Sequence, residues 1–154
     1  MARRGAPATL CDDERKIMTD KPWKNPSLSV SFGHAFAGIA FMLRTQRNAR
    51  SHAAATFAVL IAGLVFGVTA TDWRWLIVAS GLVWVSEAVN TAFEHLCDVV
   101  SPEFNVSVKH AKDVAAGAVT IAAFCAALIG LMVFWPHLVT HVWRVAAGLA
   151  ICLT

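Results

Sequence analysis

The chain has 154 residues, enough for one domain, and 57% of them are hydrophobic while only 15% are charged. A soluble domain usually carries about a quarter charged residues, so this balance indicates a membrane protein. Most of the basic residues behind the net charge of +3 lie in the N-terminal third, and they do not alternate with aromatic residues on one face, so no nucleic-acid-binding surface is expected.

The N-terminal region predicts a tail followed by a surface helix. Residues 1–26 are of mixed charge and contain three prolines, which favours a flexible tail. Ser27 is a favourable N-cap, and apolar residues then recur at helical spacing, so we expect a helix over 27–50. Because it is too short and too polar at its end to span, and closes with three arginines, it should be amphipathic and lie on the membrane surface.

Three later segments are apolar and long enough to cross a membrane, at residues 53–70, 73–100 and 110–135. Pro102 lies in the loop between the last two, and Pro136 is expected to end the third. Residues 27–137 should therefore form one all-α membrane domain with a surface helix and three transmembrane helices. Residues 138–154 form a C-terminal extension, for which a short surface helix is favoured over a fourth span.

The distribution of charge predicts an orientation. Lys and Arg concentrate in cytoplasmic segments of membrane proteins, so we expect the N-terminus inside the cell. The second span, at 73–100, would be about 42 Å long at 1.5 Å per residue, which exceeds the ~30 Å hydrocarbon core. Its C-terminal part should therefore reach the cytoplasmic face of the inner membrane.

Polar side chains form a stripe along that second span. Glu87, Asn90, Glu94 and Asp98 follow at steps of three, four and four residues. At about 100° per residue these positions fall within roughly 80° of one another on a helix. Carboxylates beside hydrocarbon cost free energy unless they face protein, water or a cation. The stripe therefore needs a partner, and such residues are functional more often than structural.

The stripe and the nearby Lys112 suit phosphoryl transfer. Mg²⁺ prefers oxygen ligands and usually takes one or two carboxylates together with substrate phosphates. Lysine is a point charge that binds phosphate, and a carboxylate at the edge of the apolar zone can accept a proton from an alcohol. The chain contains neither GxxxxGK[ST] nor GxGxxG, so a glycine-rich phosphate loop of either kind is not expected.

Two motifs carry a resemblance to a known family. Glu-x-x-Asn-Thr-Ala-x-Glu-x-x-x-Asp at 87–98 is followed by Ala-Lys-Asp-x-x-Ala-Gly-Ala-Val at 111–119. Together they resemble the signature of the small prokaryotic diacylglycerol kinases, whose Gram-positive relatives are undecaprenol kinases. The likeness extends from about Ser31 to Leu138. It implies an ATP- and Mg²⁺-dependent kinase that phosphorylates a membrane lipid alcohol, and a homotrimer with active sites between neighbouring subunits.

The resemblance also implies roles for individual residues. Glu87 would be the general base on the lipid hydroxyl, Asn90 would support the catalytic site, and Glu94 would bind Mg²⁺. The nucleotide-binding residues would be Lys112, Asp113, Glu94, Glu103, Asn105 and His34.

The chain departs from the family pattern at two of these positions. Gln46 stands where relatives have a second metal-binding glutamate, and its amide oxygen can ligate Mg²⁺ but brings no charge. We therefore expect weaker metal affinity, or one strong metal site in place of two. Asn105 stands where some relatives have histidine, which leaves that nucleotide contact open.

Several alternatives remain open at this point. Glu87 and Glu94 could belong to an ion-pair network that only stabilises packing. Glu87 could instead be the relay of a small proton-coupled transporter, although every acid of the stripe lies near one face of the membrane. The substitution at Gln46 also makes a catalytically inactive scaffold conceivable. If the protein is a kinase, its acceptor could be diacylglycerol, a polyprenol, or both.

Overall fold

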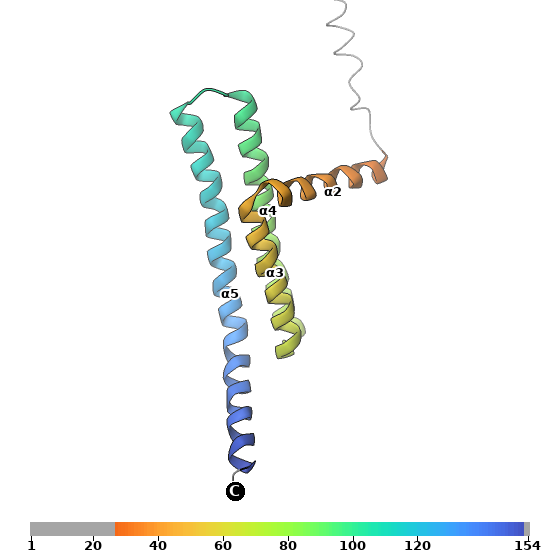
Figure 1. Cartoon of the computed structure of the whole chain (residues 1–154), viewed down its shortest axis with the longest axis vertical. Coiled ribbons are helices and arrows are strands. Elements are labelled where there is room, and N and C mark those ends of the chain that lie inside the picture. The colour runs from red at the N-terminus through yellow and green to blue at the C-terminus, as the bar shows by residue number, and fades with distance from the viewer. Residues whose placement is uncertain (1–26, 153–154) are drawn as a thin grey trace, which may run out of the picture. The chain divides into compact units, whose positions relative to one another are not determined.

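The computed structural model describes residues 27–152, which form four helices (Figure 1). These are α2 (Leu28–Thr45), α3 (Arg47–Phe66), α4 (Ala70–Val100) and α5 (Val106–Cys152). The all-helical membrane fold is confirmed, since α3, α4 and residues 106–143 of α5 are each long and apolar enough to cross a membrane. The expected N-terminal tail, at residues 1–26, lies outside the described residues. The chain divides after Gly38 into two units, and α3, α4 and α5 belong to the second.

The single helix expected over residues 27–50 is two helices. α2 ends at Thr45 and α3 begins at Arg47, with Gln46 between them in an extended conformation (φ −95°, ψ 122°). The backbone N–H of Gln46 donates to the carbonyl of Met42 at 2.8 Å, so the junction stays tight. The first span therefore begins six residues before the expected residue 53. The spacing of hydrophobic residues in the sequence did not reveal the break, because only one residue, Gln46, separates the two helices.

A short turn joins α3 to α4. Gly67 adopts a left-handed conformation (φ +62°), and its N–H and that of Val68 bond back to carbonyls in the last turn of α3. Thr69 then caps α4: its hydroxyl accepts from the N–H of Asp72, and the Asp72 carboxylate accepts from the N–H of Thr69 at 2.9 Å. The turn thus occupies residues 67–69, and Asp72 belongs to the first turn of α4.

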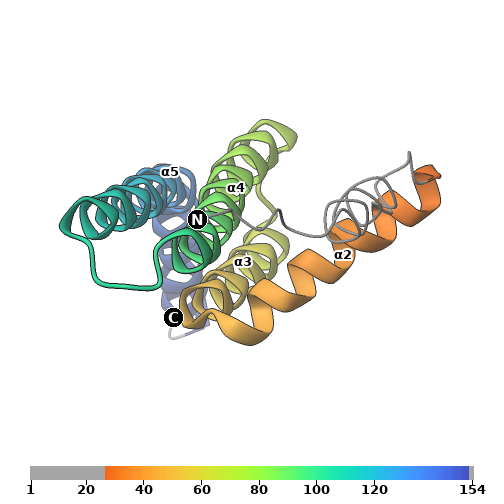
Figure 2. The same ribbon diagram turned by 90° about the horizontal axis from the view of Figure 1, so that it is seen from above.

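The three long helices pack along their lengths. α4 and α5 are antiparallel neighbours joined by residues 101–105, and α3 lies beside α4 (Figures 1 and 2). A small core forms around Leu76, Val68 and Val133, against which Trp73 packs. The helix-to-helix contact is close here because Gly63 of α3 has no side chain.

The third long helix does not end where expected. α5 begins at Val106 rather than at residue 110 and continues through Pro136 to Cys152. Proline removes one backbone hydrogen bond, which frees carbonyl groups in the preceding turn. The carbonyl that loses its donor is that of Met132, four residues before Pro136. One residue on, the His137 Nδ1–H donates to the carbonyl of Val133 at 2.9 Å. The expected separate surface helix over 138–154 is therefore wrong for residues 138–152, which prolong α5.

Gly63 provides a test of the packing between α3 and α4. A Cβ added at Gly63 would lie 2.6 Å from the Trp73 ring, whereas one added at Gly81 of α4 would meet no atom within 4 Å. We expect Gly63→Ala to destabilise the protein by roughly 1–3 kcal/mol because the bulky ring must move. Thermal unfolding in detergent micelles should show a lower Tm for Gly63→Ala than for the control Gly81→Ala. Equal melting temperatures would contradict this account of the contact.

Candidate functional site

The polar stripe of α4 begins in the protein interior and ends in solvent, since Glu94 is half-buried and Asp98 is exposed. Glu87 is 1% exposed, Asn90 6% and Thr91 5%, and these are the buried polar side chains among the described residues. On other faces of the same helix, Val85 and Val89 are each 63% exposed. α4 is thus polar inside and apolar outside, the arrangement expected where the surrounding solvent is hydrocarbon. Thr91 belongs to the signature motif, but the sequence analysis assigned it no role.

The Glu94 carboxylate accepts two hydrogen bonds, one at each oxygen. Asn90 Nδ2 donates to Oε1 at 3.1 Å from one turn earlier on α4. Gln46 Nε2 donates to Oε2 at 3.3 Å from the junction of α2 and α3. The structure therefore brings together three of the predicted residues, and Gln46 meets the site through its amide nitrogen.

Buried oxygens near this cluster have no hydrogen-bond partner among the described residues. They are Oε2 of Glu87, Oδ1 of Asn90 and Oγ1 of Thr91. Leaving a buried polar atom unpaired costs about 1–3 kcal/mol, so three together in one helix indicate a site for a ligand, a cation or water. Carboxylate and amide oxygens are the ligands that Mg²⁺ prefers, so the residues present fit this ion.

The donor set of the described chain is small. Between residues 27 and 143 no three His, Cys, Asp or Glu side chains lie together closely enough to hold a metal. A magnesium ion at Glu94 would therefore take most of its ligands from outside this set. In the magnesium sites of phosphoryl-transfer enzymes, phosphates and water usually complete the shell.

Lys112 and Asp113 make separate ion pairs at the start of α5. The Lys112 ammonium donates to the carboxylate of Asp98, which links α5 to the last turn of α4. Asp113 pairs with Lys109 at 2.5 Å within α5. Both pairs are solvent-accessible, so each contributes little to stability and can exchange partners readily. Lys112 thus lies beside Asp98, which follows Glu94 by one turn of α4.

The other predicted nucleotide contacts are exposed or have a local role. Asn105 caps α5, since its Oδ1 accepts from the N–H of Ser107 at 2.9 Å and of Val108 at 3.4 Å. Glu103 is exposed in the loop between α4 and α5. His34 is exposed on α2, in the first of the two units. The nucleotide contacts of all three remain predictions.

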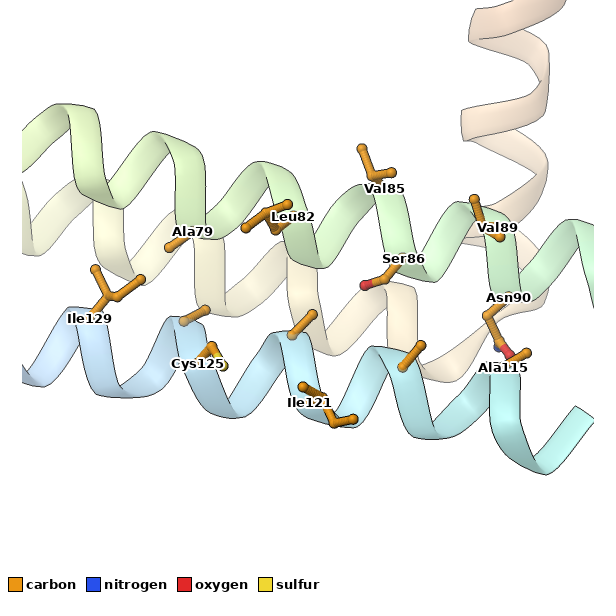
Figure 3. A pocket seen from close by; sticks show the side chains of 13 residues that line it. Ala79, Leu82, Val85, Ser86, Val89, Asn90, Ala115, Ile121, Cys125 and Ile129 are labelled. Atoms are coloured by element: carbon orange, nitrogen blue, oxygen red, sulfur yellow. The ribbon is translucent and has the colours of Figure 1, made fainter.

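Asn90 lines two cavities. An apolar groove of about 580 Å³ runs between α4 and α5, and Figure 3 shows Asn90 at one end of it with Leu82, Ile121 and Ile129 farther along. A polar pocket of about 310 Å³ is lined by Asn90 and Glu94 together with side chains of α3 and α5. Its other polar members, which the sequence analysis did not assign, are Asn48, Ser51, His52 and Thr120. Glu87 lines neither cavity.

Asn90 thus borders the apolar groove and also belongs, with Glu94, to the polar pocket. Comparison with known proteins agrees with this arrangement. The family model of prokaryotic diacylglycerol kinase matches residues 33–134, about two thirds of the chain. The chain belongs to the prokaryotic diacylglycerol kinase family.

The chain is also similar in sequence to individual proteins named as kinases of this kind. The chain is 41% identical to the undecaprenol kinase of Bacillus subtilis over 108 residues, which cover 70% of this chain and 88% of that protein. It is 36% identical to the diacylglycerol kinase of a Synechocystis species over 128 residues, which cover 82% of this chain and 73% of that protein. The expected resemblance is confirmed, and the protein is an enzyme, a lipid kinase of the membrane.

The family model covers the candidate site, since it matches residues 33–134. It includes Gln46, the α4 stripe and Lys112, and it ends two residues before Pro136. The part of α5 that follows Pro136 therefore lies outside the family match. The site belongs to the shared domain, and the prolonged end of α5 is additional to it.

Asn105 offers a test that separates capping from nucleotide binding. Asn105→Ala should destabilise the protein by about 1 kcal/mol because α5 loses its N-cap, whereas Asn105→Ser should retain the cap and the stability. Thermal unfolding in micelles measures this difference. Binding of an ATP analogue to the stable Asn105→Ser variant then reports any nucleotide contact. An unchanged Tm in Asn105→Ala would contradict the capping role.

Proposed function

We propose that this lipid kinase transfers the γ-phosphoryl group of ATP, with Mg²⁺, to the hydroxyl of a membrane lipid alcohol. Diacylglycerol and undecaprenol are the two acceptors that the names of its relatives suggest. The observation that carries the proposal is the position of Asn90, which lines both the apolar groove and the polar pocket that contains Glu94. An alcohol with a long hydrocarbon chain needs such a pair of adjoining environments.

The apolar groove suits the hydrocarbon part of the acceptor. Its lining is built almost entirely of aliphatic side chains, with the hydroxyl of Ser86 and the amide of Asn90 as polar exceptions (Figure 3). A lipid could enter sideways from the bilayer and present its hydroxyl at Asn90. The groove has no feature that separates a glycerolipid from a polyprenol, so the acceptor class proposed is a membrane lipid alcohol.

Glu87 is proposed to be the general base. It lies one helical turn before Asn90, and its carboxylate is buried, which keeps competing water away. In the proposed step the lipid hydroxyl gives its proton to Glu87 and its oxygen forms a bond to the γ-phosphorus. The bond from that phosphorus to the β–γ bridging oxygen breaks, and ADP leaves.

Glu94 is proposed to hold the magnesium ion. When bound, Mg²⁺ supplies charge neutralisation on the phosphates of ATP. Glu94 supports this role because the amides of Asn90 and Gln46 fix its orientation. Lys112 would leave Asp98 to bind a phosphate, and Asp113 would assist. Glu103, Asn105 and His34 complete the nucleotide site that the resemblance implies.

The proposed setting is the inner membrane. The basic N-terminal third supports a cytoplasmic location of the N-terminus and of the Glu94 end of α4, where ATP is available. A homotrimer, implied by the resemblance, would bring a neighbouring subunit to the exposed apolar faces of the helices. Completing the site from a neighbour would also supply polar ligands beyond the few that one chain offers.

Reconstitution tests the proposed function directly. Purified protein in mixed micelles with Mg²⁺ and radiolabelled ATP should transfer label to diacylglycerol, to undecaprenol, or to both. Proton uptake by proteoliposomes that depends on a pH gradient would favour the transporter alternative. Absence of both activities would favour an inactive scaffold.

Substitution of the two glutamates separates their roles. Glu87→Gln should reduce turnover by at least a hundredfold, the scale of a positioned general base, and leave binding of Mg-ATP nearly unchanged. Glu94→Gln should weaken Mg²⁺ and nucleotide binding because it removes the charge that holds the metal. Turnover gives the first measurement and equilibrium binding of a fluorescent ATP analogue gives the second. Full activity of Glu87→Gln would refute the base assignment.

A further inference from the structure

We propose that Gln46 is a positioning residue that holds Glu94 by donating a hydrogen bond, and that it does so before any metal binds. The inference deepens the proposed function, on which the metal-binding role of Glu94 rests. In this role Gln46 acts through its amide nitrogen, whereas a metal ligand would use the amide oxygen.

The backbone position of Gln46 makes its side chain available for this role. Gln46 is the N-cap residue of α3, but its side chain makes no capping hydrogen bond. Its backbone is held in the extended conformation and donates to Met42. The side chain is half-buried and reaches a residue 48 positions away in sequence. Glutamine is not among the side chains that cap helix N-termini well, so the long-range bond to Glu94 is the contact that this side chain makes.

The orientation of the amide follows from the chemistry of the contact. A carboxylate accepts hydrogen bonds and cannot donate them, so only the –NH₂ side of Gln46 can face Glu94 favourably. The amide oxygen on the same planar group then points away from Glu94. While this hydrogen bond persists, the amide oxygen of Gln46 cannot coordinate an ion that is bound to Oε2 of Glu94.

Asn90 donates to the other oxygen of the same carboxylate. With one amide donor at Oε1 and another at Oε2, both the position and the plane of the Glu94 carboxylate are restrained. Each carboxylate oxygen has a second lone pair, so the group can still bind a cation. By the same planar geometry, Asn90 Oδ1 points away from Glu94, and this buried oxygen has no hydrogen-bond partner among the described residues. Outer partners of this kind orient metal ligands in many proteins.

A double-mutant cycle tests whether Gln46 and Glu94 interact without metal. The variants are Gln46→Met, Glu94→Met and the double variant, since methionine has a similar length and neither donates nor accepts strongly. Thermal unfolding is measured in micelles with EDTA, without ATP or lipid. We expect Gln46→Met to lower the Tm in the wild-type background and to have much less effect in the Glu94→Met background. Equal shifts in both backgrounds would overturn the proposal.

Gln46→Glu tests the same contact by reversing its polarity. The new carboxylate would face Glu94 with like charge, so in EDTA the Tm should fall below that of Gln46→Met, and Mg²⁺ should restore it. Thr45→Glu adds the same charge at the neighbouring exposed position and should show no such recovery. A Gln46→Glu variant as stable in EDTA as the wild type would contradict the donor role.

Metal affinity gives a readout that a purely structural role would not move. Titration with Mn²⁺, followed by the loss of the free-ion paramagnetic resonance signal, should show roughly tenfold or greater weakening in Gln46→Met. The same variant should keep a single class of site. Unchanged Mn²⁺ affinity would overturn the positioning role. None of these measurements needs kinase activity, so failure here is distinguishable from failure of the proposed function.

Discussion

The structure depends on one constraint, which is that α4 carries acidic and amide side chains through a region whose surroundings are hydrocarbon. Such side chains are costly unless protein encloses them, and α4 turns Glu87, Asn90 and Thr91 inward while Val85 and Val89 face outward. The positions of α3 and α5 follow from this need, because they provide the enclosure. The site therefore arises from the same interaction that orders the helices.

Enclosure alone would leave the polar groups unsatisfied, and the amides address part of that problem. Asn90 and Gln46 both donate to Glu94, which holds the negative charge in a defined place. At the same time three buried oxygens remain without partners among the described residues. A site that is preorganised but not fully satisfied is suited to bind a cation or a polar substrate, since binding then supplies the missing interactions.

Family membership and this geometry reinforce each other. The comparisons identify the class of enzyme, and the cavities explain how one short chain could serve two very different substrates. The polar pocket and the apolar groove share Asn90 in their lining, so one residue borders both environments. The long α4, which extends beyond the hydrocarbon thickness, supplies the polar end of this arrangement.

Much of this protein could be predicted from particular stretches of sequence. Long apolar segments predicted the spanning helices, and the spacing of Glu87, Asn90 and Glu94 placed them on one face, because helical periodicity is a local property. Helix ends were predicted less well. One extended residue at Gln46 splits a continuous apolar pattern, and α5 continues through Pro136, although proline often ends a helix.

The sequence by itself determined the helical membrane fold, the family and the acidic stripe, since these follow from composition, periodicity and local motifs. Only the tertiary structure decided which partners the stripe has. Gln46 bonds to Glu94 across 48 positions of sequence, and Lys112 of α5 pairs with Asp98 of α4. The polar pocket combines Asn48, Ser51 and His52 of α3 with residues of α4 and α5. Such contacts depend on how helices are rotated and spaced against one another, and no local pattern encodes that rotation.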